Sequence, residues 1–117
     1  MTEKELKERT KKFALRIIKL VNALPKTEIG RAIINQLVRS GTSGAANYRA
    51  ACRGRSRADF IAKLGLVEEE MDESAFWLEV IIESKLMKKE LVEPLLSEAY
   101  ELLAIVVTSL KSAKSKI

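Results

Sequence analysis

Apolar residues recur every three or four positions along almost the whole chain, and this spacing constrains the possible folds more than any other feature. It places apolar side chains along one face of an α-helix. Only two prolines and five glycines occur among the 117 residues, so few positions can interrupt a helix. The longest apolar runs are short and flanked by charged residues, and no membrane-spanning helix is expected. The sequence therefore predicts an all-α protein.

We predict four helices in a single domain. The domain spans residues 1–117, and its helices cover residues 3–24, 27–53, 57–86 and 90–113. Pro25 should end the first helix, while Thr27 and Ser56 are suitable N-caps for the second and third. Pro94 either lies in the first turn of the fourth helix or shifts its start to about Glu93. Long helices joined by short turns favour an up-down-up-down antiparallel four-helix bundle.

The predicted core consists of the residues that repeat on one face of each helix. They are Leu6, Phe13, Ile17, Leu20 and Leu24; Ile33, Leu37, Ser40, Gly44, Asn47 and Ala51; Phe60, Leu64, Val67, Met71, Ser74, Leu78 and Ile81; and Leu91, Leu95, Ala99, Leu102, Val106 and Leu110. Small and polar residues in the second helix allow a close approach of its neighbours, but Ser40 and Asn47 need hydrogen-bond partners if they are buried. Gly41 and Gly44 each weaken this helix by about 1 kcal/mol relative to alanine, so it could break locally between Ser40 and Gly44.

Apolar side chains also occur away from the core face of the two middle helices. They are Ile34, Val38 and Ala45 on the second helix, and Leu66, Phe76, Trp77 and Val80 on the third. An apolar patch with an aromatic anchor usually marks an interface, although both faces could instead pack within one chain. We expect self-association through this patch, as a symmetric ring or dimer.

Charge is distributed unevenly along the chain. Residues 1–63 contain 15 basic and 5 acidic residues, whereas residues 64–117 contain 6 basic and 11 acidic ones. A basic half can attract polyanions, or it can bind the acidic half of its own fold or of a neighbouring subunit.

The basic residues that could contact phosphate gather on the second helix and the turn after it. They are Arg31, Arg39, Arg49, Arg53, Arg55, Arg57 and Lys63. The four on the helix lie within an arc of roughly 80°, directed away from its core face. One interpretation is a ridge that binds phosphate oxygens. The other is a salt-bridged seam with Glu69, Glu70 or Glu73 of a neighbouring helix or subunit. Neither predicts recognition of specific bases.

Nothing in the sequence predicts a catalytic, cofactor or metal site. The chain has no histidine, which removes the commonest general base and the usual zinc motifs of helices. Cys52 is the only cysteine, and we interpret it as a buried small residue rather than a nucleophile. The acidic residues 68–70, 72 and 73 point in different directions on a helix, which favours a solvated or salt-bridged face over a metal site. We expect a protein that is not an enzyme.

The first five residues are too charged and too acidic for a signal peptide, so a cytoplasmic protein is expected.

Several segments together resemble one bacterial family. They are Leu24-Pro25, Gln36–Ser40, Ala46–Arg53, Ser56–Phe60, Lys63–Glu70 and Phe76–Glu79. On these segments the chain resembles the four helix bundle protein family. That family includes proteins encoded in intervening sequences of 23S ribosomal RNA and accessory variability proteins of diversity-generating retroelements. The resemblance covers roughly residues 13–112. It implies a four-helix protomer, a barrel-like homopentamer and, for the retroelement members, nucleic-acid binding and partnership with a reverse transcriptase.

Two hypotheses of function follow. The first is a non-enzymatic homo-oligomer that binds RNA or DNA through backbone contacts, because a ring would multiply the avidity of a modest charged surface. The second is a protein-interaction scaffold, or an accessory protein of a reverse transcriptase, whose arginines are occupied by its own carboxylates.

Overall fold

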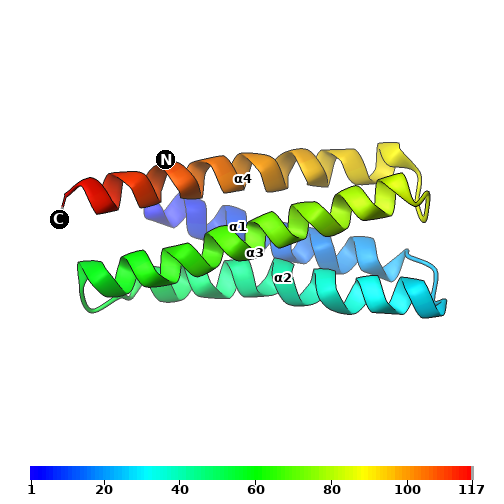
Figure 1. Ribbon diagram of the computed structural model, residues 1–117, viewed down its shortest axis with the longest axis horizontal. Coiled ribbons are helices and arrows are strands. Elements are labelled where there is room, and N and C mark those ends of the chain that lie inside the picture. The colour runs from blue at the N-terminus through cyan, green and yellow to red at the C-terminus, as the bar shows by residue number, and fades with distance from the viewer. Residues whose placement is uncertain (117) are drawn as a thin grey trace.

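The computed structural model describes residues 1–116, so Ile117, the last residue of the predicted domain, lies outside the described residues. Within this range the chain forms four helices and no strand, which confirms the all-α class. They are α1 (Glu3–Asn22), α2 (Glu28–Cys52), α3 (Arg57–Glu83) and α4 (Lys89–Ser115). The chain reverses direction at every turn, and the helices form an elongated antiparallel bundle of 47 × 20 × 19 Å (Figure 1).

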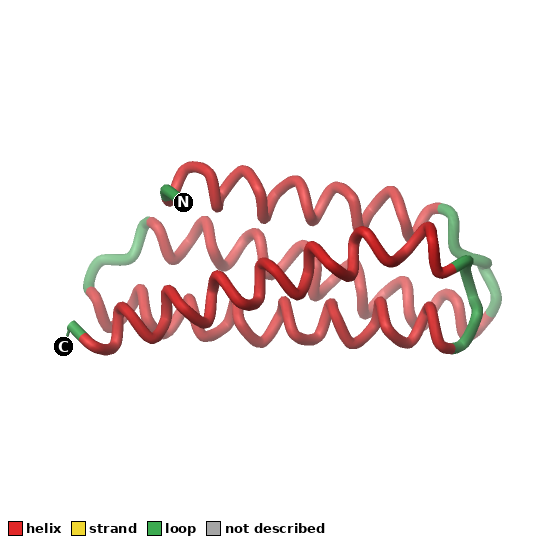
Figure 2. The backbone as a smooth tube through the Cα atoms, turned by 90° about the horizontal axis from the view of Figure 1, so that it is seen from above, coloured by secondary structure: helices red, strands yellow, loops and turns green. Residues whose placement is uncertain are grey.

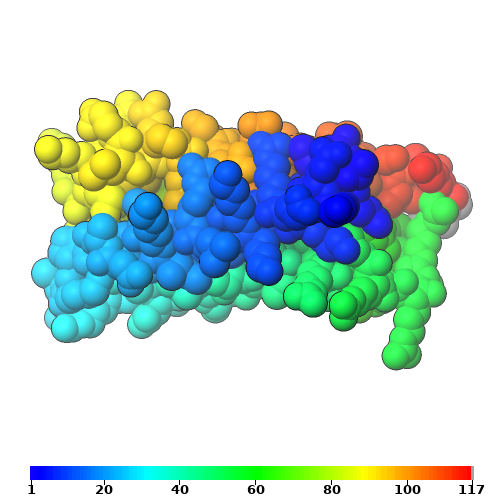
Figure 3. Space-filling view, turned by 180° about the vertical axis from the view of Figure 1, so that it is seen from behind, coloured from blue at the N-terminus to red at the C-terminus, as the bar shows by residue number. Residues whose placement is uncertain are grey.

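Each helix packs against the next one along the chain, and α1 also touches α4, which closes the bundle. Seen from above, the helices run along the long axis and the turns that connect them lie at its two ends (Figure 2). Seen from behind, α1 lies between α2 and α4, on the face opposite α3 (Figure 3). None of the helices between residues 1 and 116 is long and apolar enough to cross a membrane.

Hydroxyl side chains begin the first three helices. The Oγ1 atom of Thr27 accepts a hydrogen bond from the backbone N–H of Gly30 at 3.1 Å, and Ser56 Oγ accepts one from Asp59 at 3.1 Å. Both predicted N-caps are therefore confirmed, and each satisfies an N–H that the first helical turn leaves free. Thr2 caps α1 in the same way.

Three helices end earlier than predicted, α2 by one residue at Cys52. α1 stops two residues short, where the Lys26 ammonium donates hydrogen bonds to the backbone carbonyls of Val21 and Leu24, each at 3.0 Å. This side chain takes the place of another helical turn. α3 stops three residues short, just before Lys85, which adopts a left-handed backbone conformation with φ of 60°.

Both placements predicted for Pro94 are wrong. The fourth helix begins at Lys89, so the proline lies in its second turn. It is exposed, and on either side of it Val92 and Leu95 are buried against the other helices. Packing therefore holds the helix through a position where the proline cannot donate the usual backbone hydrogen bond.

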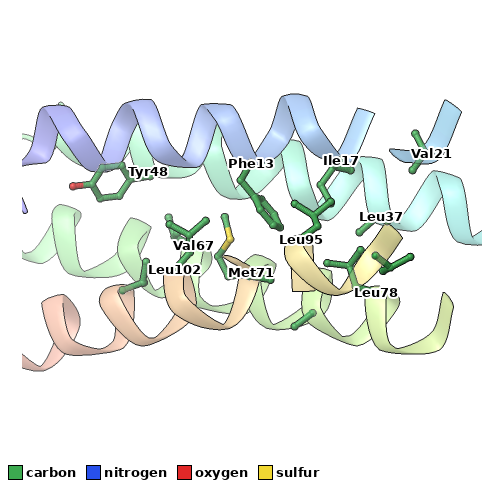
Figure 4. Close-up of a cluster of buried hydrophobic side chains, with 14 of the residues drawn as sticks. Phe13, Ile17, Val21, Leu37, Tyr48, Val67, Met71, Leu78, Leu95 and Leu102 are labelled. Atoms are coloured by element: carbon green, nitrogen blue, oxygen red, sulfur yellow. The ribbon is translucent and has the colours of Figure 1, made fainter. Parts of the chain in front are cut away.

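The predicted core is largely confirmed, and Figure 4 shows its side chains directed between the helices. Two positions were wrong by one residue. Leu91 is 62% exposed while Val92 is fully buried, and Tyr48 is buried where Asn47 is only half-buried. A helix has 3.6 residues per turn, so a strict heptad spacing drifts, and the neighbouring residue lies nearer the middle of the buried face. Leu20 and Phe60 are also only half-buried.

The small residues of α2 let both of its neighbours come close. A Cβ atom at Gly41 would lie 2.9 Å from Cγ1 of Ile17 on α1, and one at Gly44 would collide with the methyl group of Met71 on α3. The buried hydroxyls of Ser40 and Ser74 lie 2.9 Å apart across the α2–α3 contact. The helix is continuous through this region, so the local break does not occur.

Candidate nucleic-acid interface

Two arginines near the end of α2 lie between two surface grooves. The first groove, with a volume of about 730 Å³, runs toward the start of α3. It is lined by Ala46, Arg49, Ala50, Arg53, Arg55, Asp59 and Lys63. The second, of about 430 Å³, runs toward α1. It is lined by Lys7, Glu8, Lys11, Ala45, Ala46, Arg49 and Arg53. Arg49 and Arg53 therefore form a ridge that both grooves share.

We name Lys7, Lys11, Arg49, Arg53, Arg55 and Lys63 the basic ridge. It occupies the end of the bundle where α1 begins and α2 ends (Figure 3). Sequence reasoning missed Lys7 and Lys11 as members. Their spacing of four residues puts both on one side of α1, but only the packing of α1 beside α2 brings that side next to the arginines.

The ridge carries more positive charge than its own carboxylates neutralise. Among residues 1–116, no carboxylate lies within ion-pair distance of Arg49, Arg53 or Arg55. Lys63 is the exception, because its ammonium lies 3.0 Å from the Asp59 carboxylate. This hydrogen bond lowers the pKa of the Asp59 carboxyl below its usual value, so the carboxylate stays charged in the groove.

Arg39 is separate from the ridge and meets carboxylates of the neighbouring helix. Its guanidinium donates to Glu70 at 2.9 Å and forms a second ion pair with Glu73. The hydrogen bond from Arg39, and a weaker one from the indole of Trp77, lower the pKa of Glu73. The interpretation as a salt-bridged seam therefore holds at this arginine, with Glu70 and Glu73 as the partners.

The two remaining candidates lie elsewhere. Arg31 is exposed near the other end of α2 and has no ion pair in the described part of the chain. Arg57, at the start of α3, donates a long hydrogen bond of 3.5 Å to the backbone carbonyl of Ala113. The seven predicted residues are thus divided: four lie on the ridge, one lies in the α2–α3 seam and two stand apart.

Among the described residues, no aromatic side chain lines either groove of the basic ridge. Tyr48, the nearest candidate, is buried, and burial raises the pKa of its hydroxyl above the usual value. It lies beside Cys52, a half-buried residue whose thiol pKa is also raised by burial, which opposes formation of a reactive thiolate. Within residues 1–116, no group of three or more acidic, cysteine or histidine side chains is placed to hold a metal ion.

Comparison with known proteins places this chain in a family. Residues 2–108 match the family model described as 23S rRNA-intervening sequence protein. The chain belongs to this family. A solved structure with the same fold is a protein of unknown function from the S23 ribosomal protein family of Bacteroides thetaiotaomicron. It is 33% identical, the match covers 91% of this chain and 98% of that one, and the TM-score is 0.85. No curated protein matches the chain.

The predicted interface residues are only partly exposed in this chain. Ile34, Val38, Trp77 and Val80 are partly buried and pack against the core of their own chain. Leu66 and Phe76 remain 45% and 53% exposed. The ring of Phe76 packs edge-on against the neighbouring Trp77, with centroids 5.0 Å apart, so it is held in place at the surface.

Sequence reasoning missed two exposed apolar residues on α1. Leu15 is 58% exposed and Ile18 is 40% exposed. Both are directed away from the side of α1 that buries Phe13 and Ile17, and they lie among the exposed lysines of that helix, where the spacing of the core residues does not identify them.

Proposed function

We propose that this protein binds RNA or DNA through the phosphate backbone at the basic ridge, without base specificity and without catalysing a reaction. The observation that carries the proposal is the position of Arg49 and Arg53, which are shared by two grooves and have no carboxylate within ion-pair distance in residues 1–116. An arginine fork can bind two phosphate oxygens at once. The family's name, 23S rRNA-intervening sequence protein, associates its members with an RNA gene and supports RNA as a target.

The chemistry of the ridge favours backbone contacts over base contacts. Its side chains are guanidinium and ammonium groups, which suit phosphates, and Tyr48 is buried and cannot stack on a base. Release of counterions from the nucleic acid would supply most of the affinity, so binding should weaken steeply as salt increases.

The proposal includes self-assembly into a barrel-like homopentamer that acts in the cytoplasm. The resemblance to oligomeric relatives and the exposed apolar side chains of α1 and α3 support assembly. A ring presents several copies of the ridge to one nucleic acid, which raises the overall affinity without new contacts in each subunit.

The test is fluorescence anisotropy of labelled RNA and DNA duplexes at two salt concentrations. We expect the double variant Arg49→Ala, Arg53→Ala to bind at least about tenfold more weakly than the unchanged protein at low salt. Arg31→Ala is the matched control, since Arg31 is also exposed and unpaired in the described chain but lies at the other end of α2; it should bind within about twofold of the unchanged protein. Absence of binding at low salt, or equal losses in both variants, would overturn the proposal.

A second function is favoured by the Arg39 contacts. Because this arginine is occupied by Glu70 and Glu73, part of the basic surface is already neutralised. The protein would then act as a scaffold that binds another protein, such as a reverse transcriptase, through the surface that is not neutralised. Purification of a protein partner with no nucleic acid attached would favour this function over the first.

A further inference from the structure

Among the helix faces that carry exposed apolar side chains, those of α1 and α3 point in opposite directions. α1 exposes Leu15 and Ile18, whereas α3 exposes Leu66 and Phe76. α1 and α3 both pack against α2 and α4 but not against each other, so they occupy diagonal corners of the bundle. Figure 1 shows α3 at the front and Figure 3 shows α1 on the opposite side.

The two faces also carry opposite charge. α1 contains seven basic and three acidic residues, whereas α3 contains eight acidic and two basic ones. The exposed lysines nearest to Leu15 and Ile18 are Lys11, Lys12 and Lys19, and the exposed acids nearest to Leu66 and Phe76 are Glu69 and Asp72. None of these five charges forms an ion pair within residues 1–116. Each face is therefore an apolar centre surrounded by charges that its own chain leaves unpaired.

We propose that the α1 face of one molecule binds the α3 face of a second copy of this chain. The charges around the two centres attract each other, and Phe76, held by Trp77, supplies a stiff aromatic anchor for Leu15 and Ile18. This inference rests on the proposed self-assembly, and it specifies which surfaces meet. It does not depend on nucleic-acid binding.

The pairing is heterologous, because the two surfaces in contact are different. Every molecule then keeps one free face of each kind, so pairing continues beyond a dimer, and the assembly closes into a ring where the rotation between neighbours allows it and extends as a filament where it does not. A dimer built on one face meeting its own copy would place like charges opposite each other, which opposes association.

Two variants that each block one face give a decisive test. Leu15→Glu places a negative charge on the surface that should meet the acidic α3 face, and Phe76→Lys places a positive charge opposite the basic α1 face. Light scattering after size-exclusion chromatography should find each variant alone as a monomer of 13.1 kDa. An equimolar mixture should associate into at least a dimer of about twice that mass, because each variant supplies the face that the other lacks and the two introduced charges have opposite signs.

Ile29→Glu is the control, since Ile29 is 63% exposed near the start of α2, outside both faces. It should keep the mass of the unchanged protein, and circular dichroism should show unchanged helicity for all three variants. If the blocked variants remain assembled, or if their mixture stays monomeric, the pairing is wrong while self-assembly by another surface still stands. If the unchanged protein is a monomer, the proposed self-assembly fails together with this inference.

Discussion

Arg39 and Arg49 are two residues of the same kind on the same helix, yet they differ in what surrounds them. Arg39 lies opposite Glu70 and Glu73 of α3, and these carboxylates occupy its guanidinium. Arg49 lies ten residues further on, between two grooves and with no carboxylate in range among the described residues. The difference is decided by the neighbouring helix rather than by the helix that carries both.

Asp59 is the acidic residue that most directly opposes phosphate binding in the ridge. It pairs with Lys63 at 3.0 Å, and it lines the same groove as Arg49 and Arg53. Asp59→Asn should release Lys63 and remove a negative charge, so we expect binding of an RNA duplex about two- to threefold tighter at low salt. Glu83→Gln, an equal charge change at the far end of α3, should leave the affinity unchanged in the same titration. Weaker or unaltered binding by the Asp59 variant would argue against phosphate in this groove.

Glu73 should make stability depend on pH in acid. The Arg39 hydrogen bond lowers its pKa in the folded protein below the ordinary value of 4.5. A lowered folded pKa means that the contribution to stability is complete above the ordinary value and is lost as pH falls through the lowered one. Glu73→Gln should therefore destabilise the protein at neutral pH and do so by less at a pH well below 4.5, measured by urea unfolding. An equal deficit at both pH values would contradict the assigned role.

At the scale of a helix, the close packing around α2 depends on its glycines. Ile17 is fully buried and branched at Cβ, so it cannot move away from a methyl group at position 41. Gly41→Ala should lower the free energy of unfolding by about 1–2 kcal/mol, because overpacking outweighs the gain in helix propensity. Gly65→Ala on α3 is the matched control: a Cβ there meets no atom within 4 Å, so stability should rise by about 0.5–1 kcal/mol. Thermal unfolding of both variants measures the change in stability. A stabilised Gly41 variant would show that α1 and α2 can move apart enough to accept the added methyl group without a net loss of stability.

The helices themselves were largely predictable from sequence, because periodicity and capping are local. Thr27 and Ser56 were predicted as N-caps from the residues next to them in the sequence, and both act as N-caps in the structure. The position of Pro94 within α4 was not predictable, since burial of Val92 and Leu95 overrides the local preference of the proline. In the candidate site the arginines could be gathered on one side of α2 from sequence. Their separation into a paired Arg39 and an unpaired Arg49 requires the position of α3, which no local pattern supplies.

For the whole molecule, the contact between α1 and α4 is the smallest of the four between helices, and Arg9 bridges it. Arg9 donates two parallel hydrogen bonds to Glu98, both at 2.8 Å, and also pairs with Glu101. We expect Arg9→Gln to lower the free energy of unfolding by about 1 kcal/mol, and hydrogen exchange in α1 to accelerate more than in α2. Lys89→Gln removes an exposed pair at 3.8 Å within α4 and should change stability by less than about 0.5 kcal/mol. Uniform acceleration of exchange in all four helices would contradict a local role for Arg9.

Across the whole molecule, basic side chains are concentrated on α1 and α2 and acidic side chains on α3 and α4. The basic helices α1 and α2 meet at one end in the basic ridge. Carboxylates of α4 pair with Arg9 on α1, and carboxylates of α3 pair with Arg39 on α2. Binding of a polyanion requires that the unpaired positive charges of the basic ridge stay accessible.

The salt dependence of RNA binding tests this most directly. The logarithm of the affinity should fall linearly with the logarithm of the salt concentration, and the slope should become shallower by about two for each contacting subunit when Arg49 and Arg53 are both replaced by alanine. Equal slopes for the unchanged protein and the double variant would contradict the assignment of phosphate contacts to the basic ridge.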